Sequence, residues 1–154
     1  MGEETAKKYE PLRAKYKLPG FAELDREFEV ADIEDNGNVL RAVRKKVYEK
    51  IADSCAILEE VLQPDTNVSN LYESRFFDDR EKKDVFDLYR RLMSVKRRSE
   101  ALGVMNDDGS DAAFISETLV FWQKEKRQLV ALISKLQESW GKDAEEEDRL
   151  VYFG

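Results

Sequence analysis

Four carboxylates are the residues of this 154-residue chain whose types and spacing could do chemistry. Glu59 and Glu60 are adjacent near the end of one expected helix, and Glu81 and Asp84 lie three residues apart near the start of the next. Carboxylates that cluster on facing helices can hold Mg²⁺ against the phosphates of a substrate. The pattern therefore offers one enzymatic hypothesis, which depends on whether the four side chains converge.

The same pattern resembles the Glu-Glu-x-x-Glu and Glu-x-x-Asp motifs of all-α nucleoside triphosphate pyrophosphohydrolases of the MazG type. The resemblance implies a Mg-dependent enzyme that would use Glu59, Glu60, Glu81 and Asp84. The match is incomplete, because Gln63 stands where the last Glu of the first motif belongs and a proline follows it. We prefer the alternative, in which these are solvated residues of a last helical turn and first-turn residues favoured by the helix dipole.

The residues that other common catalytic sites require are absent from the sequence. The chain contains no histidine, which excludes Ser-His-Asp triads, Cys-His catalysis and zinc sites that use His. Cys55 is the only cysteine and lies on an apolar helical stripe, so we interpret it as a buried thiol. We therefore predict no catalytic residue, no metal site and no cofactor, and the sequence favours a role other than catalysis.

The composition predicts a soluble globular domain. Apolar residues make up 42% of the chain and charged residues 38%, finely interleaved. The first residues are polar, so we expect neither a signal peptide nor a membrane anchor and place the chain in the cytoplasm. The net charge of −7 opposes nonspecific binding to nucleic acid or to an anionic membrane.

Two groups of basic residues leave a nucleic-acid-associated accessory protein as a second alternative. They are Arg41, Arg44, Lys45 and Lys46, and then Arg90, Arg91, Lys96, Arg97 and Arg98. Interleaved aromatic residues are missing, and acidic residues surround both groups. Pairing along solvated helix faces explains them more simply, so we do not expect nucleic acid to be the partner.

The elements that must position these residues are helices. Apolar residues recur every three or four positions from Asn38 to Pro64, from Asp78 to about Gly103, and from Ser110, a candidate cap, to a glycine at 141. Asp78 and the Glu three residues later predict a capping box. A shorter amphipathic segment covers residues 19–28. We predict an all-α fold, an up-down-up bundle of three long helices with the short N-terminal helix packed across a groove.

The domain organisation follows from the same pattern. We expect a basic N-terminal arm at residues 1–18, extended or frayed because Pro11 interrupts it, and a helical bundle domain at residues 19–141. Residues 142–154 should form an acidic, mobile C-terminal tail. The inward stripe of the last helix is expected to be Ile115, Leu119, Trp122, Leu129, Ile133, Leu136 and Trp140. Lys126 interrupts that stripe, either as a snorkelling side chain at the rim of the core or as a buried cation.

Two segments are candidate partner-binding sites. Residues 119–122 are apolar around a whole helical turn, so something other than the bundle core must cover Val120 and Phe121. The short N-terminal helix is the cover we favour, and a second copy or a small molecule are the alternatives. The last apolar residues could form a docking peptide, pack on the bundle or have no role. They are Leu150, Val151, Tyr152 and Phe153.

The stretch Leu18-Pro19-Gly20-Phe21-Ala22-Glu23-Leu24-Asp25 through Phe28, with Leu62-Gln63-Pro64 after a helix, resembles a group of uncharacterised archaeal helical proteins. The resemblance implies a microbial cytoplasmic helical bundle and no activity. We interpret the chain as a helical interaction or scaffold module, working as a dimer. Its partner would be a protein or a second copy, and any small-molecule ligand stays open.

Overall fold

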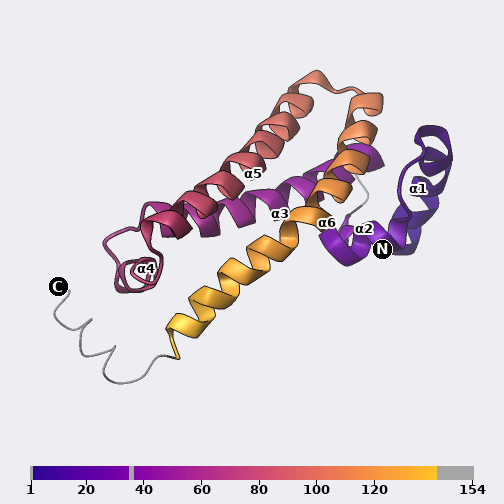
Figure 1. Ribbon diagram of the computed structural model, residues 1–154. Coiled ribbons are helices and arrows are strands. Elements are labelled where there is room, and N and C mark those ends of the chain that lie inside the picture. Colours follow the sequence, from indigo (N-terminus) through magenta and orange to yellow (C-terminus); the bar gives the residue numbers. More distant parts are fainter. Residues whose placement is uncertain (1, 35–36, 142–154) are drawn as a thin grey trace. The chain divides into compact units, whose positions relative to one another are not determined.

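The computed structural model describes residues 2–34 and 37–141. Within these ranges every regular element is a helix, which confirms the all-α class (Figure 1). The elements in chain order are α1 (Gly2–Tyr16), α2 (Phe21–Phe28), the 3-10 helix η1 (Val30–Asp32), α3 (Val39–Leu62), α4 (Val68–Ser74), α5 (Asp79–Met105) and α6 (Asp108–Ser139).

The chain groups into two compact units. The first unit takes residues 1–53 and 92–124, and the second takes residues 54–91 and 125–154. The three long helices α3, α5 and α6 each contribute part of their length to both units. The units are described separately below.

In the first unit, residues 2–16 form α1 where the sequence analysis expects an extended or frayed arm, so that expectation was wrong. Pro11 lies inside the helix and removes one backbone donor, which ordinarily breaks a helix. Buried side chains offset this loss. The Thr5 hydroxyl donates to the carbonyl of Ile33 at 3.3 Å, and the Tyr9 hydroxyl donates to the carbonyl of Pro19 at 2.5 Å. Tertiary contacts that cannot be inferred locally therefore hold α1.

The short helix α2 forms at the predicted place and packs against the first half of α6. Leu24 and Phe28 are buried, and the Phe28 ring lies 6.1 Å from the ring of Trp122. The Trp122 indole N–H donates to the Glu27 carboxylate at 2.9 Å. One aromatic residue therefore joins α2 to α6 by packing and by a hydrogen bond.

Helix α3 agrees with its prediction at both ends. Asn38 caps it, because its side chain accepts a hydrogen bond from the backbone N–H of Arg41 at 3.0 Å. The helix ends at Leu62, since the residue before Pro64 is driven out of the α region. Its buried apolar side chains include Leu40, Val43, Val47, Ile51, Cys55 and Leu58.

In the second unit, the predicted capping box opens α5. The backbone N–H of Glu81 donates to Asp78 Oδ1 at 2.8 Å, and the backbone N–H of Asp78 donates to Glu81 Oε1 at 3.2 Å. Phe77, directly before the cap, is buried, and the Lys135 ammonium lies 4.8 Å from the centre of its ring. The capping box is therefore confirmed.

The predicted end of α5 near Gly103 is confirmed, whereas the predicted cap of α6 was wrong. Helix α5 passes Gly103 and ends at Met105, and Asn106 takes the left-handed conformation that closes it, with φ of 56°. Helix α6 is capped by Asp107, whose carboxylate accepts from the backbone N–H of Ser110 at 2.9 Å and from its hydroxyl at 2.6 Å. Hydrogen bonds from Ser110 lower the pKa of Asp107. Asp107, directly before the helix, is therefore the cap, and Ser110 is the residue that donates hydrogen bonds to it.

The inward stripe of α6 also departs from the prediction. Glu125 is buried where Lys126 was expected to interrupt the stripe, and Lys126 is half-buried. The Glu125 carboxylate accepts hydrogen bonds from Arg91 of α5 at 2.9 and 3.2 Å. A buried carboxylate with a charged partner thus replaces the apolar residue that a regular stripe would carry.

Beyond this point Leu129 is buried and Leu136 is half-buried as predicted, but the other two predicted inward positions are displaced by one residue. Leu132 is half-buried and Ser139 is buried. Ile133 and Trp140, which were expected to face inward, are 37% and 49% exposed. The prediction for these two residues was therefore wrong, and both contribute apolar surface to the second unit.

Candidate interaction surface

The four carboxylates of the enzymatic hypothesis do not assemble into a metal site. Glu59 and Glu60 are exposed and line a shallow hollow of about 350 Å³ together with Asp65. Glu81 serves the α5 cap and pairs with Lys135, and Asp84 is exposed. Among residues 2–34 and 37–141, no three acidic or cysteine side chains lie close enough to hold a metal ion. The geometry therefore gives the carboxylates solvated and capping roles.

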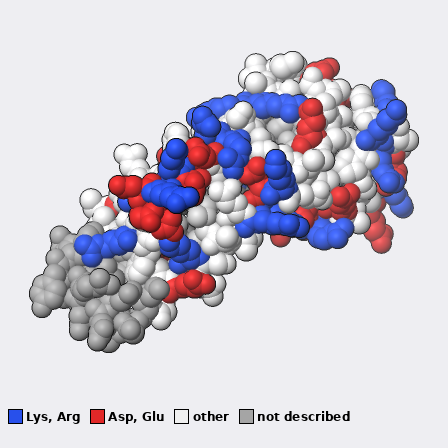
Figure 2. Space-filling view, in the orientation of Figure 1, with Lys and Arg blue, Asp and Glu red and all other residues white. Residues whose placement is uncertain are grey.

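Five residues of the two basic groups form ion pairs with acidic residues of their own unit. Arg98 contacts Glu117 at 2.5 Å, Arg97 contacts Glu100 at 2.7 Å, and Lys46 contacts Glu49 at 3.7 Å. Arg44 and Arg91 are paired with Asp111 and Glu125. On the face shown in Figure 2, Lys and Arg side chains lie among Asp and Glu side chains. This neutralisation weighs against a nucleic-acid surface, which requires a continuous basic area.

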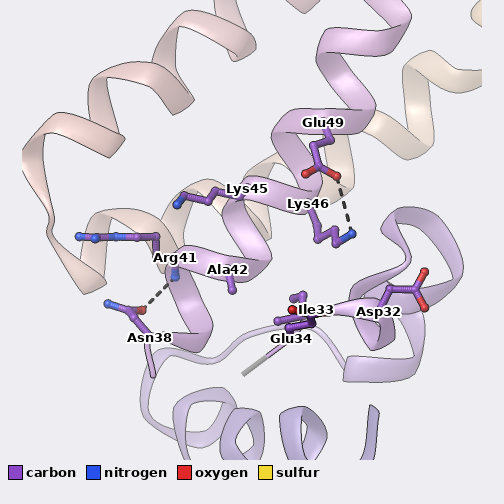
Figure 3. A pocket seen from close by; sticks show the side chains of 9 residues that line it. All are labelled: Asp32, Ile33, Glu34, Asn38, Arg41, Ala42, Lys45, Lys46 and Glu49. Atoms are coloured by element: carbon purple, nitrogen blue, oxygen red, sulfur yellow. Dashed lines mark hydrogen bonds and ion pairs between the residues drawn. The ribbon is translucent and has the colours of Figure 1, made fainter. Parts of the chain in front are cut away.

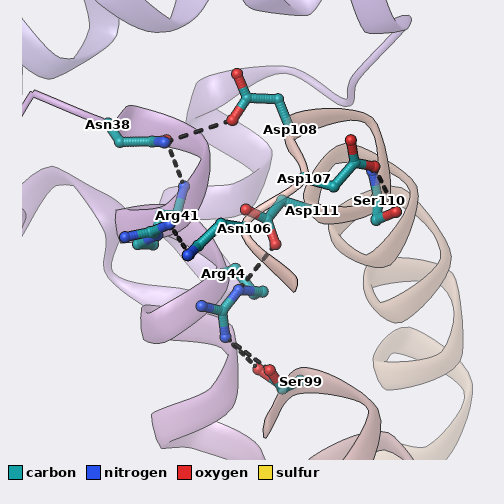
Figure 4. A network of polar contacts seen from close by, with 9 residues as sticks. All are labelled: Asn38, Arg41, Arg44, Ser99, Asn106, Asp107, Asp108, Ser110 and Asp111. Carbon is teal, nitrogen blue, oxygen red and sulfur yellow. Dashed lines mark hydrogen bonds and ion pairs between the residues drawn. The ribbon is translucent and has the colours of Figure 1, made fainter. Parts of the chain in front are cut away.

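A polar network in the first unit joins α3, α5 and α6 (Figure 4). The Nε atom of Arg44 lies 3.0 Å from Asp111 Oδ1, and their side chains are only 5% and 2% exposed. Arg44 Nη1 also donates to the Ser99 carbonyl and hydroxyl, each at 2.9 Å. Burial raises the pKa of Asp111, and the Arg44 guanidinium opposes that rise. Nearer the surface, the Arg41 guanidinium donates to the side chain of Asn106. The network is a clamp between helices, because its polar groups face one another.

A hollow of about 460 Å³ lies beside the start of α3 (Figure 3). Its charged lining residues are Arg41, Lys45 and Lys46, and Asp32, Glu34 and Glu49. Figure 3 shows Lys46 directed toward Glu49, with which it is paired at 3.7 Å. Equal numbers of cationic and acidic side chains favour neither an anionic nor a cationic ligand. The hollow therefore defines no ligand class.

The apolar turn in the first half of α6 is covered only in part. Trp122 contacts α2, Leu119 is buried and Phe121 is half-buried. Val120 is 68% exposed, and its neighbours one turn away, Glu117 and Gln123, are polar and exposed. Val120 and Phe121 therefore stay predicted partner contacts, but they do not form a continuous apolar patch with the residues around them.

A longer exposed apolar stripe follows the second half of α6 and ends at Trp140, the residue directly after the helix. Val130 is 59% exposed, and Ile133 and Trp140 follow it at exposures of 37% and 49%. With Lys126 and Gln137 these residues alternate at spacings of four and three. Such spacing places side chains along one line of a helix and is the seam by which two helices pair. The periodicity of apolar residues predicts Ile133 and Trp140 in the core, so this stripe is not apparent from the sequence.

Trp140 is fixed at the end of the stripe. Its ring stacks on Tyr72 of α4 with centroids 4.3 Å apart, and its indole N–H donates to Glu73 at 2.8 Å. The Tyr72 hydroxyl donates to the carbonyl of Ser139 at 2.5 Å. These contacts immobilise an aromatic residue that remains half exposed, which lowers the entropy lost when it is covered.

The remaining predicted partner contacts, Leu150, Val151, Tyr152 and Phe153, lie outside the described residues. Among the helices that the structure describes, none has the length and apolar composition needed to cross a membrane. No protein-family profile, curated protein or solved structure matches this chain. The function must therefore be argued from the surfaces described above.

Proposed function

We propose that the chain is a helical interaction module that works as a dimer and binds through the second half of α6. The observation that carries this proposal is the stripe of Val130, Ile133 and Trp140, which exposes apolar side chains at the spacing used in helix pairing. For the same reason we place the interface here and not at Val120, which is flanked by exposed polar residues. We also propose that the chain works in the cytoplasm and that its three long helices run in an up-down-up order.

Light scattering behind a sizing column tests the dimer directly. We expect a mass near twice the 17.9 kDa of one chain at high micromolar concentration, falling toward the single-chain mass on dilution. A mass of one chain throughout the concentration series would contradict self-association. The experiment needs no knowledge of a partner and no substitution.

The competing enzymatic hypothesis is tested by titration with Mg²⁺ and Mn²⁺. A site that binds either ion in the folded chain must raise the melting temperature as the ion concentration increases. We expect no such rise from these ions, because the structure disperses the carboxylates Glu59, Glu60, Glu81 and Asp84. A melting temperature that climbs with metal concentration would restore the MazG-type alternative.

A further inference from the structure

We infer that the partner of the α6 stripe is a second copy of this chain whose α6 runs antiparallel to the first. This inference rests on the proposed function, since it names the occupant of the same surface and its orientation. The stripe is defined as Lys126, Val130, Ile133, Gln137 and Trp140, all in the second unit.

Charge polarity along the second half of α6 is the observation that selects a second copy. Lys126 and Arg127 precede the apolar centre of the stripe, and Glu138 follows it. Arg127 and Glu138 are both exposed. Eleven residues separate these two, which is close to three helical turns, so both lie on the same side of the stripe. The helix thus presents a cationic end and an acidic end on either side of an apolar middle.

Antiparallel pairing brings the unlike ends together. With a two-fold axis midway between Val130 and Ile133, Val130 of each copy packs on Ile133 of the other, and Lys126 lies opposite Gln137. Arg127 of the first copy then lies two residues along its helix from the position that faces Glu138 of the second copy. A parallel pair would hold the two cationic ends at one level and the two Glu138 residues at another, so it would bring no unlike charges together and would leave like charges to repel. The net charge of −7 opposes association of two copies in general, so an orientation that offsets it locally is favoured over one that does not.

Two matched substitutions test whether the stripe is the interface. Val130→Lys places a charge at the centre of the stripe, and Val104→Lys places the same charge at an exposed valine of α5, away from the stripe. We expect the first to raise the dimer dissociation constant by at least about tenfold, because an apolar contact is lost twice across a two-fold axis, and the second to leave it nearly unchanged. Circular dichroism checks that both variants retain their helix content.

Cysteine cross-linking tests the orientation. Lys126→Cys and Gln137→Cys are prepared separately, mixed and oxidised, with the unmodified chain, whose Cys55 is buried, as the control. Antiparallel pairing predicts a disulfide only in the mixture. Identical positions would lie about 16 Å apart in that arrangement, at a rise of about 1.5 Å per residue, too far for a disulfide bond.

Each outcome has a distinct meaning. A dimer that dissociates on Val130→Lys and cross-links only in the mixture supports the inference. A dimer that survives Val130→Lys overturns the inference and leaves the proposed dimer standing. Disulfide formation by Lys126→Cys alone overturns the antiparallel orientation, and a chain that stays a monomer overturns both the inference and the proposed function.

Discussion

Replacing Arg44 by Met tests the clamp between the helices of the first unit. The substitution keeps most of the side-chain volume but removes the cation that faces Asp111 at 3.0 Å. It also removes the donor that the Ser99 carbonyl and hydroxyl share. An isolated carboxylate then remains in a site where its side chain is 2% exposed. We therefore expect a large loss of stability.

The size of the loss follows from what stays buried. Breaking a buried ion pair by removing one partner costs about 3 to 5 kcal/mol, because the remaining charge loses its partner and does not regain water. For a chain of this length that corresponds to a fall in melting temperature of roughly 6 to 20 °C. Replacing both members, as in Arg44→Met with Asp111→Leu, removes the stranded charge as well. The double variant should recover most of the lost stability.

The pH dependence of the Arg44→Met variant gives a second test. Burial already raises the pKa of Asp111 above its ordinary value of 3.8, and loss of the guanidinium raises it further. A carboxyl whose pKa is raised by folding stabilises the folded state below its unfolded pKa, and this contribution is lost as pH rises through the folded pKa. The destabilisation should therefore be smaller in acid than at neutral pH, because protonation of the Asp111 side chain removes the unpaired charge.

Urea unfolding followed by circular dichroism measures these differences, with Arg98→Met as the matched control. Arg98 contacts Glu117 across the same unit, but the two side chains are 45% and 64% exposed, so its loss should cost about 1 kcal/mol or less. The reasoning is refuted if Arg44→Met and Arg98→Met lower the urea midpoint equally. It is also refuted if adding Asp111→Leu makes the Arg44→Met variant less stable still.

Three further substitutions have defined outcomes in the same urea assay. Asp107→Asn keeps a side chain that can cap α6 but cannot titrate. Hydrogen bonds lower the pKa of Asp107, so the unmodified chain should lose the stability that this cap contributes as pH falls through the lowered pKa, and the variant should not. Gly103→Ala should stabilise α5 by about 0.5 to 1 kcal/mol, because alanine has the higher helix propensity. The added Cβ would lie 3.5 Å from Arg44 Nη2, an ordinary contact distance, so a loss of stability would mean that the guanidinium needs this space. Glu125→Gln should cost about 1 to 2 kcal/mol, less than Arg44→Met, because the Arg91 side chain is 40% exposed and can regain water; an equal loss would contradict this.

The sequence predicted the elements whose local chemistry is complete. Asn38, Pro64 and the Asp78 capping box define helix ends through contacts within a few residues, and all three acted as expected. Pro11 failed as a predictor because α1 is held by Tyr9 and by other contacts distant in sequence. Local rules cannot supply such contacts.

The errors on α6 have a different physical origin. Residues 123–128 are all polar, so periodicity alone gives no indication of which one faces the core. The buried residue is Glu125, and it is tolerated because Arg91 on another helix supplies its partner. The inward side of α6 then continues through Leu129, Leu132, Leu136 and Ser139, which leaves Ile133 and Trp140 exposed. The candidate interaction surface could therefore not be found before the buried residue of this polar segment was known.

The two tryptophans of this chain are divided between the units, with Trp122 in the first and Trp140 in the second. Trp122 is 6% exposed and should emit toward the blue, whereas Trp140 is 49% exposed and stacked on Tyr72. Because the six tyrosines can be avoided by exciting at the red edge, indole fluorescence separates the units optically. Trp122→Phe leaves an emission that belongs to the second unit alone, and Trp140→Phe leaves that of the first. Comparing the two variants therefore shows whether the two units unfold together or separately.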